Sequence, residues 1–130
     1  MLAFRGQLKS ADGVFISSPE YAHGVPGALK NALDWVVGSG ELVDKPAAIL
    51  NTSEMATYAQ ASLKETITVM SGHVVTGASL TIPLQGKRLD EFGIAADPEL
   101  SRLVLKAIKE FTSAIESSVL NSAAFIESTE

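Results

Sequence analysis

Short apolar runs alternate with longer segments of helical periodicity, and this alternation constrains the fold more than any other feature of the sequence. Gly13–Ser17 and Pro46–Leu50 have the length and apolar content of buried strands, and His73–Ile82 is predicted to be a third. Leu2–Ser10 is predicted to be the end of a helix. Strands that alternate with helices predict a parallel sheet with right-handed crossovers and helices on both faces. The sequence therefore predicts a three-layer α/β/α fold, in a single domain over residues 1–130.

Capping residues mark where the later helices are expected to begin. Pro26 suits the first position of a helix that Gly38 ends, Ser53 is a good N-cap for the next, and Asp97 for the last. Residues 83–96 are polar and predicted to be irregular, and residues 121–130 are predicted to be a frayed tail. The buried face of the last helix is predicted to comprise Leu100, Leu103, Val104, Ala107, Ile108, Phe111 and Ile115.

Composition excludes several classes of protein. The net charge is −5 and the basic residues are scattered, so no nucleic-acid partner is predicted. No apolar run is long enough to span a bilayer and no signal peptide is visible, so a cytoplasmic location is the default. The chain has no Cys and its two histidines, His23 and His73, lie far apart, so no metal site is predicted.

Two loops are candidates for the chemistry. In an open α/β sheet, ligands bind at the carboxyl ends of the strands. The loop Ser17–Gly24 holds an aromatic ring, a carboxylate and an imidazole, and the loop Asn51–Ser53 is short and hydroxyl-rich. The second loop leads into a helix N-terminus, where free N–H groups favour an anion or a carbonyl oxygen.

The residues Ser18–Tyr21, followed by Gly24–Trp35, resemble the NADPH-dependent FMN reductase family, which includes chromate-, quinone- and azo-reducing enzymes. The similarity continues through Asn51–Ser53, Gln60–Leu63 and the helix from Asp97, and so covers nearly the whole chain. The resemblance implies a flavodoxin-like fold and an oxidoreductase in which FMN takes a hydride from NAD(P)H. The electrons would pass to a small-molecule acceptor, such as a quinone, a metal oxyanion or a flavin.

The resemblance also implies the residues that bind the cofactor. In the family the first loop lies along the flavin ring and ribityl chain, and the second wraps the polar edge of the ring. The implied FMN-binding residues are Pro19, Glu20, Tyr21, Asn51, Thr52 and Ser53. No catalytic residue is assigned, because the hydride chemistry belongs to FMN. On the residues alone, Tyr21 could instead be a loop aromatic that covers the core, and Glu20 a carboxylate at a helix end or turn.

The sequence departs from the family at three places. Many relatives have Asn where Ala22 stands, and Pro or Gly and then Arg where Glu54 and Met55 stand. Glu54 would bring a negative charge near the nicotinamide entrance, so the choice of NADH or NADPH stays open. The family's phosphate-binding strand and loop do not precede Met1. We therefore expect an N-terminally truncated domain in which FMN binding is weak or absent.

Two other functions remain open at this point. The chain could be a non-catalytic remnant, or an interaction module that dimerises through the helix at Pro26–Val37. Either way we expect a homodimer or homotetramer, because an apolar edge strand and an amphipathic helix should not stay exposed to water. The association is expected to cover Val14, Phe15 and Ile16, or the face formed by Leu29, Leu33 and Val36.

Overall fold

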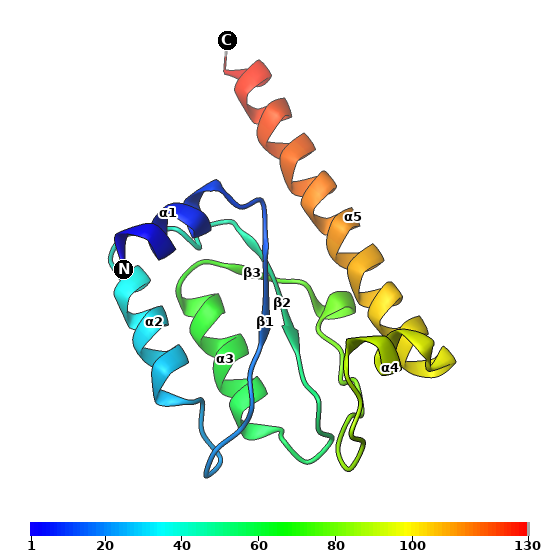
Figure 1. The fold of residues 1–130 in the computed structure, drawn as a ribbon. Coiled ribbons are helices and arrows are strands. Elements are labelled where there is room, and N and C mark those ends of the chain that lie inside the picture. Colours follow the sequence, from blue (N-terminus) through cyan, green and yellow to red (C-terminus); the bar gives the residue numbers. More distant parts are fainter. Residues whose placement is uncertain (130) are drawn as a thin grey trace.

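The computed structural model describes residues 1–129, which form a three-stranded parallel sheet (Figure 1). Its strands are β1 (Val14–Ser17), β2 (Pro46–Leu50) and β3 (His73–Val74), in the order β1-β2-β3. Both pairings are parallel, which confirms the predicted α/β fold. β3 is shorter than predicted, because a 3₁₀ turn, η1 (Thr76–Ala78), interrupts it before Thr81 forms a single parallel bridge with Asn51, the residue after β2.

The helices are α1 (Leu2–Ser10), α2 (Gly27–Val37), α3 (Tyr58–Val69), α4 (Glu91–Ala96) and α5 (Pro98–Ser128). α1, α2 and α5 begin close to the predicted positions, whereas α3 begins later than predicted and α4 was not predicted. Asp97 caps α5 as predicted, and its Oδ1 accepts the N–H groups of Glu99 and Leu100 at 3.0 Å each. α4 lies in a segment predicted to be irregular, and α5 continues through the tail that was predicted to fray.

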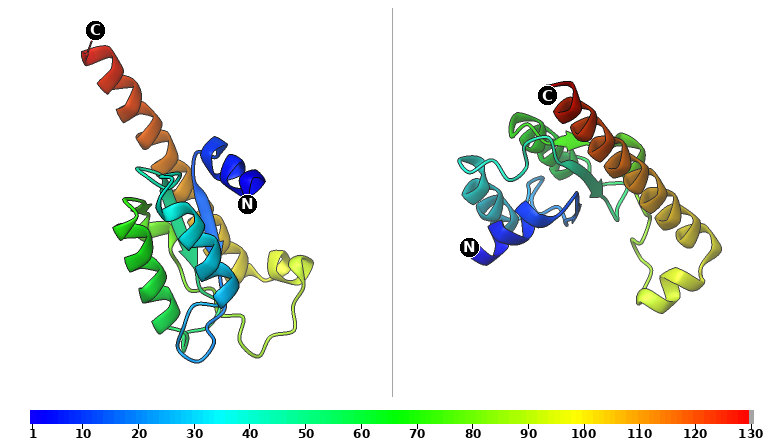
Figure 2. Two further views of the ribbon diagram at one scale, coloured as in Figure 1. Left: turned by 90° about the vertical axis from the view of Figure 1, so that its left-hand side faces the viewer. Right: turned by 90° about the horizontal axis from the view of Figure 1, so that it is seen from above.

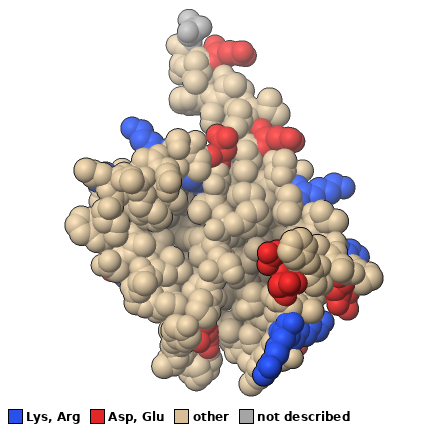
Figure 3. All heavy atoms as spheres, in the orientation of Figure 1, with Lys and Arg blue, Asp and Glu red and all other residues tan. Residues whose placement is uncertain are grey.

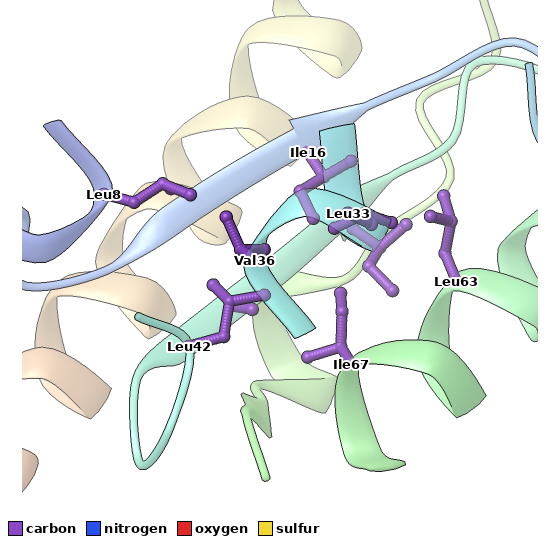
Figure 4. Close-up of a cluster of buried hydrophobic side chains, with 9 residues drawn as sticks. Leu8, Ile16, Leu33, Val36, Leu42, Leu63 and Ile67 are labelled. Carbon is purple, nitrogen blue, oxygen red and sulfur yellow. The ribbon is translucent and has the colours of Figure 1, made fainter. Parts of the chain in front are cut away.

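Helices cover the sheet on both faces (Figure 2). α1, α2 and α3 pack on one face, and α5 packs on the other. The first layer is held by a cluster of buried side chains (Figure 4), namely Leu8, Ile16, Leu33, Val36, Leu42, Ala47, Ile49, Leu63 and Ile67. The second consists of Ala48, Val75, Ala78 and Phe111. β2 serves both clusters, because alternate residues of a strand point to opposite faces.

The two surfaces expected to need a partner are largely covered within the chain. Leu33 is 5% exposed and Val36 1%, because α2 packs them against the sheet. On β1, Ile16 is buried and Phe15 packs on Phe111, with the ring centroids 4.2 Å apart. Phe15 nevertheless stays 38% exposed, and on α5 Ile108, predicted to be buried, is 47% exposed.

A salt bridge ties α1 to the turn after α2. Arg5 Nε lies 2.6 Å from Glu41 Oε1, and the Ser39 hydroxyl donates a hydrogen bond to the other carboxylate oxygen. The Ser39 hydrogen bond, and then the Arg5 guanidinium, lower the pKa of Glu41 from 4.5 to about 2. The folded state therefore holds this carboxylate ionised at a pH where the unfolded chain protonates it.

This difference predicts a pH-dependent contribution to stability. A pKa that is lower in the folded state stabilises the fold above about pH 4.5, and that contribution is lost as the pH falls towards 2. Glu41→Gln should therefore flatten the dependence of the free energy of unfolding on pH in this window, as measured by urea unfolding. Glu65→Gln, on the exposed side of α3, is the control and should leave the slope unchanged. Equal slopes for wild type and Glu41→Gln would contradict the assignment.

Candidate functional site

The loops that follow β1 and β2 meet at the carboxyl ends of the strands around a hollow of about 340 Å³. Its lining consists of Ser18, Pro19, Glu20, Asn51, Thr52, Ser53, Ala56, Leu84 and Gln85. Five of the six predicted cofactor-binding residues thus line one concave site. The sixth, Tyr21, is the next residue in the first loop, but it is 67% exposed and does not line the hollow.

Asn51 organises the second loop from inside the protein. It is 5% exposed, and its side-chain nitrogen lies 2.7 Å from the Ser53 carbonyl oxygen and 2.9 Å from that of Ala56. Its side-chain oxygen accepts the Ser53 N–H at 3.2 Å. A buried amide must find such partners, since each unpaired group would cost about 1–3 kcal/mol. The Asn51 side chain is therefore a positioning group, and it shapes the peptide groups that face the hollow.

Glu20 reaches across from the first loop to cap α3. Its Oε2 accepts the N–H of Ala59, in the first turn of the helix, at 2.8 Å. A carboxylate is favourable there because the first N–H groups of a helix lack partners and carry partial positive charge. From the sequence, these N–H groups were predicted to face a ligand and Ser53 was predicted to be the N-cap. The structure instead begins α3 at Tyr58, because the bonds to Asn51 hold residues 53–56 in a non-helical turn.

Residues 80–85 close the hollow; the sequence predicted a strand up to Ile82 and irregular surface from Pro83. The Asn51 N–H donates to the Leu80 carbonyl at 3.0 Å, and the Leu84 N–H donates to the Thr52 carbonyl at 3.1 Å. Gln85 then lies beside the site, with its side-chain oxygen 2.7 Å from the Ser53 hydroxyl. The signal that could have found it is the apolar stretch Leu80–Leu84, which continues the line of the short β3.

The tip of the first loop is a tight turn of unusual composition. Tyr21 and Gly24 exchange both backbone hydrogen bonds, at 3.0 and 2.9 Å. Between them, Ala22 and His23 have φ of 48° and 61°, as in a type I′ turn, which normally takes Asn or Gly at these positions. The His23 ring stacks on Tyr58 of α3 with the centroids 4.2 Å apart. The first loop is therefore attached to α3 twice, by this stack and by Glu20.

The lining of the hollow is polar but carries little charge. Among the residues that form it, Glu20 is the one ionisable group, and there is no Lys or Arg. The Thr52 N–H has no acceptor within residues 1–129, so it remains available to a ligand. Such a surface suits an uncharged molecule that carries carbonyl and hydroxyl groups better than it suits an anion.

The fold and this site define a flavodoxin-like α/β protein with its ligand loops at the carboxyl ends of the strands. The NADPH-dependent FMN reductase family model matches residues 1–87, and the chain belongs to that family. The chain is 31% identical over 124 residues to the NADH-dependent flavin reductase subunit 2 of Lactobacillus johnsonii, a match covering 87% of this chain and 67% of the relative. It is 33% identical over 100 residues to the NAD(P)H-dependent FMN reductase of Pseudomonas aeruginosa, over 68% of this chain and 54% of that protein.

Comparison of structures shows the same fold. FerB, described as a flavoenzyme NAD(P)H:(acceptor) oxidoreductase from Paracoccus denitrificans, superposes with a TM-score of 0.78 at 24% identity, over 90% of this chain and 68% of FerB. A shorter match, 46% identical over 57 residues, covers 41% of this chain and 29% of a quinone reductase of Escherichia coli. This chain thus spans between about a third and two thirds of the length of these relatives. Within the described residues, no helix is long and apolar enough to cross a membrane.

The Glu20 cap predicts a measurable loss of stability. Glu20→Ala would leave the Ala59 N–H unpaired and should lower the free energy of unfolding by about 1 kcal/mol, a typical value for removal of a helix cap. Hydrogen exchange at Ala59 should also become faster. Glu54→Ala removes an exposed carboxylate from the neighbouring loop and is the matched control. Equal free energies of unfolding for the two variants would show that the Glu20 cap does not stabilise the protein.

The left-handed backbone at Ala22 predicts that a substitution there can stabilise the protein. Ala22→Asn should raise the free energy of unfolding by about 0.5 kcal/mol, because Asn tolerates positive φ better than Ala does. The same substitution at Ala61, an exposed helical position of α3, should instead destabilise the protein by up to about 0.7 kcal/mol. Chemical denaturation of the two variants checks the pair, and a destabilised Ala22→Asn would show that the turn differs in solution.

Proposed function

We propose that this chain works in an NAD(P)H-dependent reductase that uses FMN to pass electrons to a small-molecule acceptor. One observation supports it most: the two loops that carry the family's sequence motif form one hollow at the carboxyl ends of β1 and β2. A quinone, a metal oxyanion or a flavin is the acceptor we propose, and the quinone is favoured by the match to quinone reductases. FMN, when bound, supplies the hydride chemistry.

The lining fits the ring and ribityl parts of FMN. The polar edge of a flavin ring carries carbonyl and N–H groups, and the ribityl chain carries hydroxyls, so both need neutral hydrogen-bonding partners. Thr52 offers its N–H group and its hydroxyl, and Asn51 keeps the loop in place through its bonds to the Ser53 peptide groups. Pro19 offers a rigid apolar surface for the ring, and Tyr21 stands beside the hollow as a further contact. Excluding water and orienting the ring would be the work of these residues.

The lining does not fit the FMN phosphate equally well. Charge-assisted hydrogen bonds contribute about 1.5–3 kcal/mol each, and the residues around the hollow include no cation. Forgoing two or three such bonds would weaken binding by about 3–6 kcal/mol, or about two to four decades. We therefore propose that the 130-residue chain binds FMN weakly and has little reductase activity by itself. A cytoplasmic location stays a prediction, as does a homodimer or homotetramer.

A non-catalytic role is the competing proposal. A remnant or interaction module would keep the fold and lose the cofactor, and it would purify colourless and show no affinity for flavin. Since weak binding would also leave the protein colourless after purification, colour alone does not separate the two. Titration does, because weak binding saturates at high flavin concentration and absence of binding does not.

The proposal predicts that FMN and riboflavin bind with similar affinity. Without a cation at the phosphate, removal of the phosphate should change the dissociation constant by less than about tenfold. Quenching of flavin fluorescence measures both constants. Tyr21→Ala should weaken both, whereas Phe92→Ala, an exposed aromatic residue on α4 outside the lining, should leave both unchanged.

Two outcomes would contradict this proposal in different ways. Tight, stoichiometric FMN binding with riboflavin far weaker would mean that a cationic group outside the lining reaches the phosphate. No saturation with either flavin would favour the non-catalytic alternative. Oxidation of NADH or NADPH with a quinone as acceptor, measured with added FMN, then tests whether any bound cofactor is active.

A further inference from the structure

The first turn of α3 contacts both loops that form the hollow. The Ala59 N–H donates to the Glu20 carboxylate of the first loop at 2.8 Å, and the Tyr58 ring stacks on the tip of the same loop. The Gln60 Oε1 lies 3.2 Å from the side-chain nitrogen of Asn51, at the start of the second loop. Three consecutive residues of one helix thus connect the loops on the two sides of the site.

The stack between Tyr58 and His23 attaches the tip of the first loop to α3. The ring centroids are 4.2 Å apart and the ring planes are inclined by 18°. Glu20 and His23 lie three residues apart in the loop, and they are attached to the neighbouring helix residues Ala59 and Tyr58. Tyr21 lies between these two attachments, so the helix determines where Tyr21 stands relative to the hollow.

The backbone of the tip needs such support from outside the loop. Ala22 and His23 have φ of 48° and 61°, a left-handed conformation that residues other than Gly rarely adopt. The Ala22 side chain forms no hydrogen bond that would compensate for this conformation. Strained backbone of this kind persists when surrounding contacts hold it, and the Tyr58 ring supplies such a contact.

Ion pairs do not hold the first loop in place. The two ion pairs among residues 1–129 are Arg5–Glu41 and Lys30–Asp34, and neither involves the loop or the first turn of α3. In Figure 3 the lower left of the molecule, where the loop that follows β1 lies in Figure 1, carries mostly uncharged side chains. The aromatic stack and the Glu20 hydrogen bond are therefore the contacts that attach this loop to α3.

We propose that Tyr58 is a positioning residue for flavin binding, which acts through His23 to hold the first loop in the conformation that lines the hollow. This role rests on the proposed function, because it concerns the same flavin site. Tyr58 does not itself line the hollow, whereas Pro19 and Glu20 do. A loop that is held in place before the ligand arrives loses less conformational entropy on binding, so the stack raises the affinity for the flavin.

Hydrogen exchange of the flavin-free chain tests the attachment. The N–H groups of Tyr21 and Gly24 bond to each other's carbonyl groups, so their exchange reports opening of the tip. Tyr58→Ala should make both exchange about twofold to tenfold faster, which corresponds to about 0.5–1.5 kcal/mol for an aromatic pair. Tyr58→Phe keeps the ring and should restore the wild-type rates. Phe92→Ala is the matched control, because exposed Phe92 belongs to neither ring pair among residues 1–129.

Titration with riboflavin, followed by quenching of its fluorescence, tests the consequence for binding. Riboflavin has no phosphate, so it probes the hollow alone. Tyr58→Ala should raise the dissociation constant by about twofold to tenfold, because a smaller fraction of the chain keeps the loop in place, and Tyr58→Phe should not. His23→Ala should raise it too, and adding Tyr58→Ala to that variant should have no further effect, because both changes remove the same contact. Urea unfolding verifies that every variant is folded.

The results that would overturn this role differ from those that would overturn the proposed function. Equal exchange rates in wild type and Tyr58→Ala would show that the stack does not hold the loop. Riboflavin binding by wild type with an unchanged or lower dissociation constant in Tyr58→Ala, or additive effects of the two substitutions, would overturn the positioning role alone. Absence of flavin binding by wild type would overturn the proposed function, and the positioning role with it.

Discussion

The central strand β2 is the constraint on which the rest of the structure depends. It is covered by helices on both faces, and Ala47 and Ala48 in its middle are fully buried. Small side chains there let α5 approach on one side and leave room on the other for Leu63 and Ile67 of α3. A polar or larger residue at either position would push a helical layer away, since protein interiors leave few voids to absorb added volume. This packing therefore also fixes the position of the loop at the carboxyl end of β2.

The candidate site is built mainly from bonds that the protein makes to itself. Asn51 and Glu20, both predicted to bind the cofactor, line the hollow and also form hydrogen bonds within the protein. Asn51 shapes the loop after β2, and Glu20 holds the loop after β1 against α3. At the resulting surface the Thr52 N–H has no acceptor among residues 1–129, whereas the Ser53 peptide groups bond to Asn51 and the Ser53 hydroxyl to Gln85. Among the residues that line the hollow, Glu20 is the one charged side chain, and its carboxylate is bonded to α3.

Local signals predicted the fold well and the site only in outline. The strands at Val14–Ser17 and Pro46–Leu50, their parallel pairing and the Asp97 cap all follow from periodicity and capping chemistry, which act over a few residues. The α3 N-terminus was misplaced because its cap, Glu20, comes from a loop 39 residues away in sequence. Gln85 was missed for the same reason, since only the folded chain brings it to Ser53. The exposure of Ile108 was missed because periodicity identifies an apolar stripe without saying what covers it.

The self-sufficient bonding of Asn51 has a consequence for how such a site changes over time. Apart from the Gln60 side chain, whose Oε1 lies 3.2 Å from the Asn51 side-chain nitrogen, its partners are main-chain carbonyl and N–H groups, which are the same whatever side chain stands at those positions. Neighbouring residues such as Glu54 and Met55, both exposed, can therefore be exchanged without altering the path of the loop. The buried Asn51 amide thus holds the shape of the loop independently of the side chains at its exposed positions. Substitutions at these exposed positions would change the surface beside the hollow and leave the path of the loop as it is.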